Sequence, residues 1–121
     1  MEDYDNKEIG KLGERLAADF LQKRGYEIID KNFTCPVGEI DLVARDNGTV
    51  VFIEVKSRSS NRFGLPIEAV DFHKRRKMVQ VALFYMKKNN LSGFGLRFDI
   101  VSVLINRQEE KALLNLTKNA F

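Results

Sequence analysis

The sequence predicts an α/β fold in which one mixed sheet is flanked by helices. Three observations support this prediction. Apolar residues recur at helical spacing in two separate segments, 9–21 and 78–85. The pair Asn47-Gly48 separates two stretches rich in β-branched residues, which is a strong signal for a β-hairpin. A further β-rich stretch follows the second helical segment, so we expect that helix to join two parallel strands through a right-handed crossover.

The expected element order is αβββαβ, with one more strand that forms a hairpin at the C-terminus. Gly25 is expected to end the first helix, and Asp71 is a suitable N-terminal cap for the second. The stripe of the second helix that should be buried consists of Met78, Val81, Ala82 and Tyr85. Strands are expected over 26–33, 38–45, 50–56, 96–105 and 112–117, with a polar connection over 57–66. Residues 1–121 should form a single domain.

Composition narrows the classes of protein to consider. The 121 residues are 44% hydrophobic and 31% charged, which is typical of a soluble globular domain. No apolar run is long enough for a membrane span, and the acidic start does not resemble a signal peptide. Cys35 and His73 are the single residues of their types, which argues against disulfides, cysteine zinc sites and Ser-His-Asp triads. We expect a cytoplasmic protein whose chemistry uses oxygen ligands, and the net charge of +3 is compatible with an anionic partner.

The hairpin register brings two acidic residues together. Counting outward from Asn47-Gly48 places Asp41 opposite Glu54 and Glu39 opposite Lys56. Directly opposed side chains have Cβ atoms about 4.5–5.5 Å apart, where two carboxylates repel each other. One face of this hairpin is apolar throughout and should be buried: Ile40, Leu42, Ala44, Val51, Ile53 and Val55. The other face carries Val43 and Phe52 before it reaches the two acids, so these lie at the edge of an apolar surface.

Two carboxylates at such an edge need a compensating charge, because desolvation disfavours the ionised form. Carboxylate oxygens suit Mg²⁺ or Mn²⁺, with a backbone carbonyl and waters completing the coordination. Lys56 projects to the same face as Glu54, two residues away, and could activate a nucleophile or neutralise a phosphate.

Three other interpretations remain open at this point. Glu39 and Lys56 could form an ordinary cross-strand ion pair. Asp41 could face solvent while Glu54 pairs with Arg97 or Lys74. A bulge in the hairpin would shift the register.

Basic residues follow the acidic pair along the chain. The run His73-Lys74-Arg75-Arg76-Lys77 opens the second helix, where cations oppose the helix dipole. Arg58 and Arg62 lie just beyond Lys56, where a phosphate backbone could approach the acids. The predicted nucleic-acid contacts are Arg58, Arg62, Lys74 and Arg75. The alternative for each is a solvated charged side chain, and Phe63 is expected to anchor the loop.

Four motifs resemble a known family. They are Gly10-x-x-Gly13-Glu14-x-x-Ala17, the segments 38–44 and 52–58, and Arg97-Phe98-Asp99-Ile100-Val101. Together they resemble the YraN family of small bacterial proteins, within the restriction-endonuclease-like superfamily. They are similar, more distantly, to archaeal Holliday-junction resolvases, which share the αβββαβ core. The superfamily's proline before the aspartate is replaced here by Ile40.

The resemblance implies a divalent-metal-dependent nuclease with catalytic residues Asp41, Glu54, Lys56 and Glu14. Asp41, Glu54 and the Val55 carbonyl would hold Mg²⁺ or Mn²⁺, and Lys56 would act on the attacking water or the phosphate. The substrate would be nucleic acid, DNA rather than RNA and branched if the resolvases are a guide, and those relatives are homodimers. The alternative is a nucleic-acid-binding protein with a vestigial nuclease site.

On a helical wheel, Glu14 flanks the apolar stripe of the first helix. Gly10 and Gly13 would let that helix approach the sheet closely.

Overall fold

The computed structural model describes residues 6–59 and 72–121. The predicted order of elements is confirmed, including the additional C-terminal strand. The elements are α1 (Asn6–Lys23), β1 (Glu27–Cys35), β2 (Gly38–Asp46), β3 (Thr49–Ser59), α2 (Phe72–Lys88), β4 (Gly95–Asn106) and β5 (Lys111–Thr117). Asp71, predicted to cap α2, lies outside the described residues.

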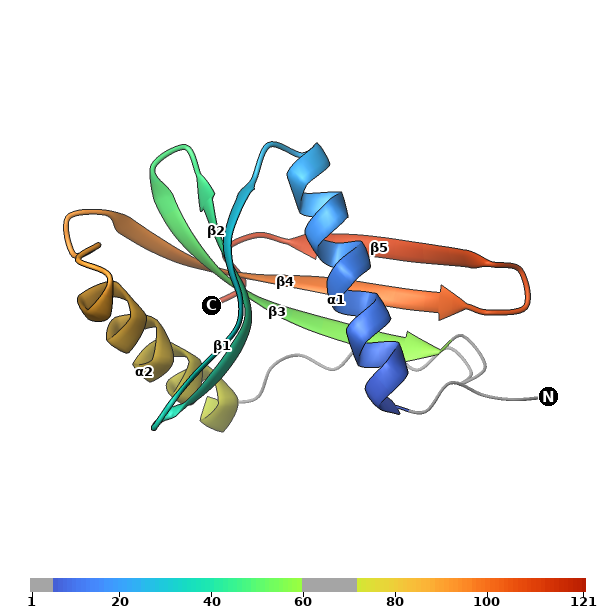
Figure 1. The fold of residues 1–121 in the computed structure, drawn as a ribbon, viewed down its shortest axis with the longest axis horizontal. Helices are drawn as coiled ribbons and strands as arrows, with labels where there is room; N and C mark the ends of the chain where they lie inside the picture. Colours follow the sequence, from blue (N-terminus) through green and yellow to red (C-terminus); the bar gives the residue numbers. More distant parts are fainter. Residues whose placement is uncertain (1–5, 60–71) are drawn as a thin grey trace.

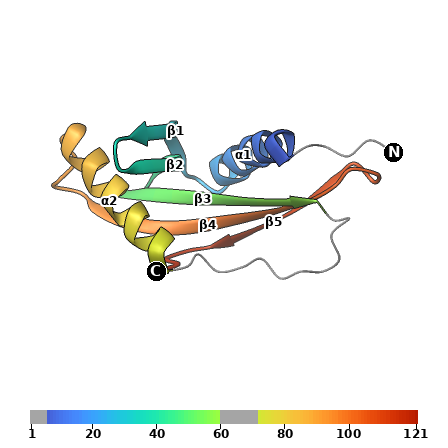
Figure 2. The same cartoon turned by 90° about the horizontal axis from the view of Figure 1, so that it is seen from below.

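The five strands form one mixed sheet in the order β1-β2-β3-β4-β5 (Figure 1). β3 and β4 pair in parallel, as expected for two strands joined through α2, and the other neighbours are antiparallel. α1 and α2 lie over different halves of the sheet, as both ribbon views show (Figures 1 and 2). Alternate residues of β3 pack with each helix, so the two helices cover opposite faces. Among the described residues, no helix is long and apolar enough to cross a membrane.

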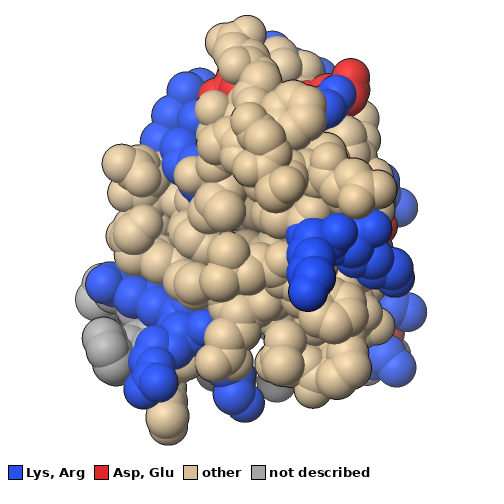
Figure 3. Space-filling model, turned by 90° about the vertical axis from the view of Figure 1, so that its left-hand side faces the viewer, with Lys and Arg blue, Asp and Glu red and all other residues tan. Residues whose placement is uncertain are grey.

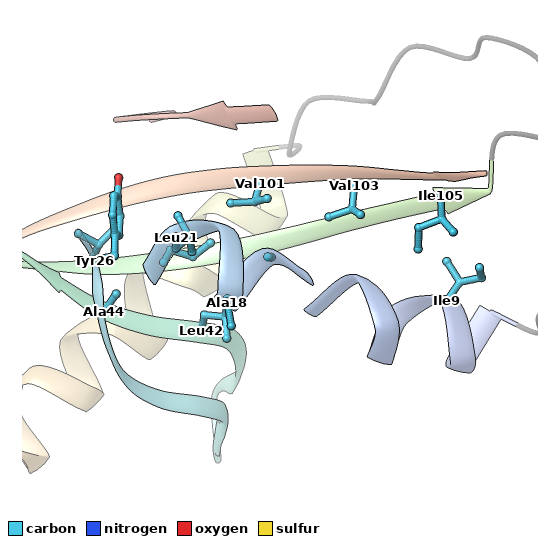
Figure 4. Packing of buried hydrophobic residues seen from close by; sticks show 12 residues of the cluster. Ile9, Ala18, Leu21, Tyr26, Leu42, Ala44, Val101, Val103 and Ile105 are labelled. Atoms are coloured by element: carbon cyan, nitrogen blue, oxygen red, sulfur yellow. The ribbon is translucent and has the colours of Figure 1, made fainter. Parts of the chain in front are cut away.

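Two hydrophobic cores result, one on each face. Under α1, Leu21 and Ile9 pack with residues of β2, β3 and β4, and Figure 4 shows Ile9 beside Ile105. Under α2, the predicted stripe of Met78, Val81, Ala82 and Tyr85 is buried, which confirms that prediction. Its centre is aromatic, with Tyr85 meeting Phe52 edge-on at a centroid distance of 5.7 Å.

Ile40 is the exception to the predicted hairpin faces. Leu42, Ala44, Val51 and Ile53 share the α1 side as expected, but Ile40 packs on the α2 side. The physical reason is a bend in the sheet between Ile40 and Leu42. The ladder between β2 and β3 ends at Leu42–Ile53. On the other side of β2, Asn32 lies opposite the bend and has a φ of 52°, a left-handed conformation that turns the edge strand.

The start of the polar connection after β3 was also predicted wrongly. Residues 57–59 continue β3 instead of opening a loop. They do so because β4 is long enough to pair with them, as far as Ser59 opposite Ile105.

Gly13 allows α1 to approach this extended end of β3 closely. A Cβ atom at Gly13 would lie 1.7 Å from the Ser57 hydroxyl oxygen and 2.8 Å from Ser57 Cβ. No atom lies within 4 Å of the equivalent position at Gly10. The predicted packing role therefore holds for Gly13 and is wrong for Gly10.

A polar cluster centred on Asp99 lies where the β2–β3 hairpin meets β4. Asp99 is fully buried and accepts hydrogen bonds from the Tyr26 hydroxyl at 2.7 Å and the Arg97 Nε at 2.9 Å. Its Oδ1 also accepts the backbone N–H of Asn119 at 2.9 Å. Arg97 continues to Asp46 at 2.9 Å, so this guanidinium joins two carboxylates. The cluster ties the hairpin and the C-terminal segment to β4.

Candidate active site

Asp41 lies at the bend, one residue beyond the last rung between β2 and β3. The predicted rungs nearer the turn, Arg45–Val50 and Val43–Phe52, are confirmed. The two outer rungs, which would join Asp41 to Glu54 and Glu39 to Lys56, are not part of the ladder. Asp41 instead extends its carboxylate toward β3, where Oδ2 accepts the Val55 N–H at 2.8 Å. The bend thus converts a strand residue into one whose side chain binds the neighbouring backbone.

Glu54 projects from β3 to the α2 side of the sheet and is only 8% exposed. Its Oε1 atom lies 2.5 Å from the Lys74 ammonium in the first turn of α2. Of the two partners that the sequence left open for Glu54, the structure selects Lys74. Arg97 is engaged by Asp46 and Asp99 in the other polar cluster.

Asp41 is electrostatically unusual. Burial and the nearby Glu54 carboxylate raise the pKa of Asp41 to about 7 from an ordinary value of 3.8, and Glu14 adds to the increase. The hydrogen bond from Val55 and the charge of Lys74 act in the opposite direction but do not cancel it. Desolvation and like charge therefore outweigh the available compensation.

Glu14 of α1 interacts electrostatically with the same group of carboxylates. Partial burial raises the pKa of Glu14, a hydrogen bond from the Asn32 side chain lowers it, and the charges of Glu39 and Glu54 raise it. Glu14 therefore feels the field of the same carboxylates as Asp41. α1, the sheet bend and β3 together place three of the four predicted catalytic residues in one electrostatic neighbourhood.

A pocket of about 240 Å³ opens beside these carboxylates. Its lining consists of Gly38, Glu39, Asp41, Glu54, Lys74, Lys77 and Met78. Gly38 forms part of the pocket wall. Its φ of 150° favours glycine, and a Cβ atom at this position would lie 3.1 Å from Val81 Cγ2. The pocket combines acidic side chains from the sheet with basic ones from α2.

The remaining predicted residues are distributed around this pocket. Lys56 is half-buried on β3, two residues after Glu54, and outside the set of described residues that lines the pocket. Arg58 lies on β3 rather than in a loop, and its guanidinium donates to the Ser57 carbonyl at 3.0 Å. The central guanidinium carbon of Arg75 lies 5.4 Å from the centroid of the Phe121 ring. Arg62 and Phe63 lie outside the described residues.

Lys77 was given no role of its own by the sequence, yet it lines the pocket. The sequence feature that could have indicated this position is the spacing of the two lysines. Lys77 follows Lys74 by three residues and therefore projects from the same side of a helix. What the sequence did not show is which side of α2 faces the acids.

The donor set of the site consists of oxygens. Asp41 and Glu54 contribute carboxylates, a type of ligand that suits Mg²⁺ or Mn²⁺, and their mutual repulsion is what a divalent cation would relieve. Within 6–59 and 72–121, no three His, Cys, Asp or Glu side chains are grouped closely enough to hold a metal by themselves. The residues therefore fit a cation whose coordination is completed by backbone oxygen and water.

The fold and this site define an α/β protein built on the αβββαβ core of restriction-endonuclease-like proteins, with an acidic pair beside its central hairpin. Comparison with known protein sequences identifies the family of this chain. Residues 13–103 match the uncharacterised protein family UPF0102. A UPF0102 protein of Caldanaerobacter subterraneus is 47% identical over 109 residues, covering 90% of this chain and 89% of the relative. The chain belongs to UPF0102, the YraN-like family in the restriction-endonuclease-like superfamily.

Other relatives match over nearly the whole chain. A UPF0102 protein of Caldicellulosiruptor saccharolyticus is 42% identical, covering 97% of this chain and 99% of its own length. One from Clostridium botulinum is 44% identical, covering 98% and 97%.

Proposed function

We propose that this protein is a divalent-metal-dependent nuclease that hydrolyses phosphodiester bonds in nucleic acid, DNA in preference to RNA. The observation that carries the proposal is the pair Asp41 and Glu54, a partly buried and a buried carboxylate beside an open pocket, whose negative charge is incompletely compensated. Strongly shifted pKa values in a cleft are a physical indication of a functional site. Membership of the restriction-endonuclease-like superfamily supports the same conclusion.

Each residue has a distinct role in this proposal. Asp41 and Glu54, with the Val55 carbonyl, would hold Mg²⁺ or Mn²⁺, which supplies Lewis-acid stabilisation of charge at the phosphate. The Asp41 carboxylate is oriented by its hydrogen bond from Val55, so its free oxygen is held in place. Lys56 would accept a proton from the attacking water if it acts as the neutral amine, or neutralise the phosphate if it acts as the ammonium, and Glu14 would orient water from the α1 side.

The basic side chains at the pocket would bind the phosphate backbone. Lys74 and Lys77 line the pocket itself, and Arg58 and Arg75 lie on the adjoining β3 and α2. Contacts of this kind give affinity and salt dependence without selecting a base sequence.

The test is cleavage of plasmid, flap and junction DNA by purified protein with Mn²⁺. Asp41→Asn should abolish cutting, because it removes the charge that holds the cation while keeping the size of the side chain. Asp19→Asn is the matched control, since Asp19 lies on α1 in an exposed ion pair with Lys23. Equal cutting by the wild type and Asp41→Asn would identify a contaminant and reject the proposal.

A second candidate is a nucleic-acid-binding protein with a vestigial nuclease site. The observation that favours it is the Lys74 ammonium, which already neutralises part of the charge on Glu54. This candidate predicts salt-sensitive binding that persists in EDTA and no cleavage with any divalent ion.

A further inference from the structure

One flank of α2 combines basic and aromatic side chains in a regular pattern. Lys77, Phe84 and Lys88 are separated by seven and four residues, so they project from the same side of the helix. Lys77 lines the pocket, and Lys88 lies in the last turn, about 16 Å along the helix axis. We call these three residues, with Phe33 of β1, the α2 strip.

The aromatic part of the strip is exposed and supported from below. Phe84 is 40% exposed, and its ring lies 6.3 Å from that of Phe33, tilted by 41°. Phe33 in turn packs edge-on against the buried Tyr85 at 4.9 Å. The Lys88 ammonium lies 5.5 Å from the centroid of the Phe33 ring. The strip therefore presents a ring held by the hydrophobic core, with a cation at each end.

The charged side chains of α2 itself, the single histidine left aside, are all basic. α2 carries six Lys or Arg residues and no acidic residue. Figure 3 shows the side of the molecule that carries α2 as a broad neutral surface with basic side chains to either side and little acidic surface. A helix of this composition repels cationic partners and attracts a polyanion.

We infer that the α2 strip binds a single-stranded segment of nucleic acid and leads it to the pocket. This inference rests on the proposed function for the nature of the partner, and it specifies which form of nucleic acid is bound. Alternating cations and exposed rings are how proteins hold a single strand, because phosphates meet the cations while bases stack on the rings. A duplex keeps its base faces inside the stack, so it has no partner for the Phe84 ring.

The absence of tryptophan from the chain allows a site-specific test. Phe84→Trp would place the single tryptophan on the strip, where stacking bases quench its fluorescence. Leu83→Trp is the matched control, because Leu83 is 57% exposed on the adjacent position of α2 but points away from the strip. Oligo(dT) added in EDTA should quench the tryptophan at position 84 and leave that at position 83 nearly unchanged, and a fully paired, blunt-ended duplex should quench neither.

Affinity measurements by fluorescence anisotropy complete the test. Phe84→Ala should weaken oligo(dT) binding about 5- to 150-fold, the usual effect of losing one base stack. Lys88→Met should reduce the slope of log affinity against log salt by about 0.7, whereas Lys23→Met on α1 should not. Circular dichroism checks that each variant is folded.

The inference is overturned by equal quenching at positions 83 and 84, by no quenching at position 84, or by a duplex that quenches as well as oligo(dT). Because these experiments contain no divalent ion, their result is independent of cleavage. Quenching without any nuclease activity would retain the strip and reject the proposed catalysis. Cleavage without quenching would retain the nuclease and reject the strip.

Discussion

The two acidic clusters of this protein, each with one buried carboxylate, differ in how their charge is balanced. Asp99 receives hydrogen bonds from Tyr26, Arg97 and the Asn119 backbone, and Arg97 also pairs with Asp46. The hydrogen bond to Asp99 is the main cause of an Arg97 pKa raised above its ordinary value, so the guanidinium is firmly charged. Buried charge in this cluster is compensated within the protein.

At the Asp41–Glu54 pair the compensation is incomplete. Asp41 has one backbone hydrogen bond and Glu54 has Lys74, yet burial and mutual repulsion still raise the pKa of Asp41 to about 7. The same residue type therefore serves two purposes. The Asp99 cluster is compensated within the fold, and the pair at the sheet bend retains the incompletely compensated charge on which the proposed cation site depends.

The largest expected effect comes from breaking the balanced cluster. Arg97→Met leaves the fully buried Asp99 without its counterion and should lower the free energy of unfolding by about 3–5 kcal/mol. Urea denaturation of the variant and the wild type measures this loss. Arg97→Lys, which keeps the charge but not the forked hydrogen bonds, should lose less. A change below about 1 kcal/mol for Arg97→Met would contradict a structural role for the cluster.

Substitution at the incompletely compensated Asp41–Glu54 pair should have the opposite effect, an increase in the free energy of unfolding. The pKa of Asp41 is higher in the folded protein than its ordinary 3.8, so folding favours the protonated form. The stability linked to this group is fully present below pH 3.8 and is lost as the pH rises through about 7. Asp41→Asn removes that loss and should be more stable than the wild type at about pH 8, by at least about 1 kcal/mol.

Denaturation curves across this pH range test the sign of the effect. The advantage of Asp41→Asn should shrink as the pH falls toward about 4, where the wild-type carboxyl is also neutral. Asp19→Asn on α1 should show no such trend, because Asp19 is exposed. A wild type that is the more stable protein at about pH 8 would show that Asp41 is adequately compensated.

The smallest effect concerns Lys74. Its ammonium and a divalent cation would compete for Glu54, so Lys74→Met should bind Mn²⁺ about 2- to 5-fold more tightly than the wild type, given the small free energy of an ion pair whose lysine is half-exposed. Calorimetry in the absence of nucleic acid measures this change. Lys77→Met is the control, since Lys77 lines the same pocket. Weaker Mn²⁺ binding by Lys74→Met would indicate that Lys74 supports the metal site instead of competing with it.

The features that the sequence predicted correctly depend on local chemistry. Asn47-Gly48 determined the hairpin register because both turn residues accept a positive φ, and the structure has 50° and 85° there. The buried stripe of α2 follows from helical periodicity alone. The order of the elements followed from these local signals, and the parallel pairing of β3 with β4 followed from the helix between them.

The features that the sequence missed depend on contacts between distant segments. Ile40 changes faces because β2 leaves β3 after Leu42 and bends with Asn32, which no alternation pattern reveals. Glu54 meets Lys74 because the crossover brings the first turn of α2 over β3, so counting along the chain could not choose between Lys74 and Arg97. The hairpin register and the family resemblance both indicated Asp41 and Glu54 as site residues, but their charge balance required coordinates.

Calorimetric titration of Mn²⁺ into the wild type, Glu54→Gln and the exposed-site control Glu27→Gln tests the central claim most directly. If Asp41 and Glu54 form an uncompensated pair that requires a cation, the wild type and Glu27→Gln should bind Mn²⁺ equally and Glu54→Gln should lose that binding. No heat of binding from the wild type, or equal binding by Glu54→Gln, would contradict the account.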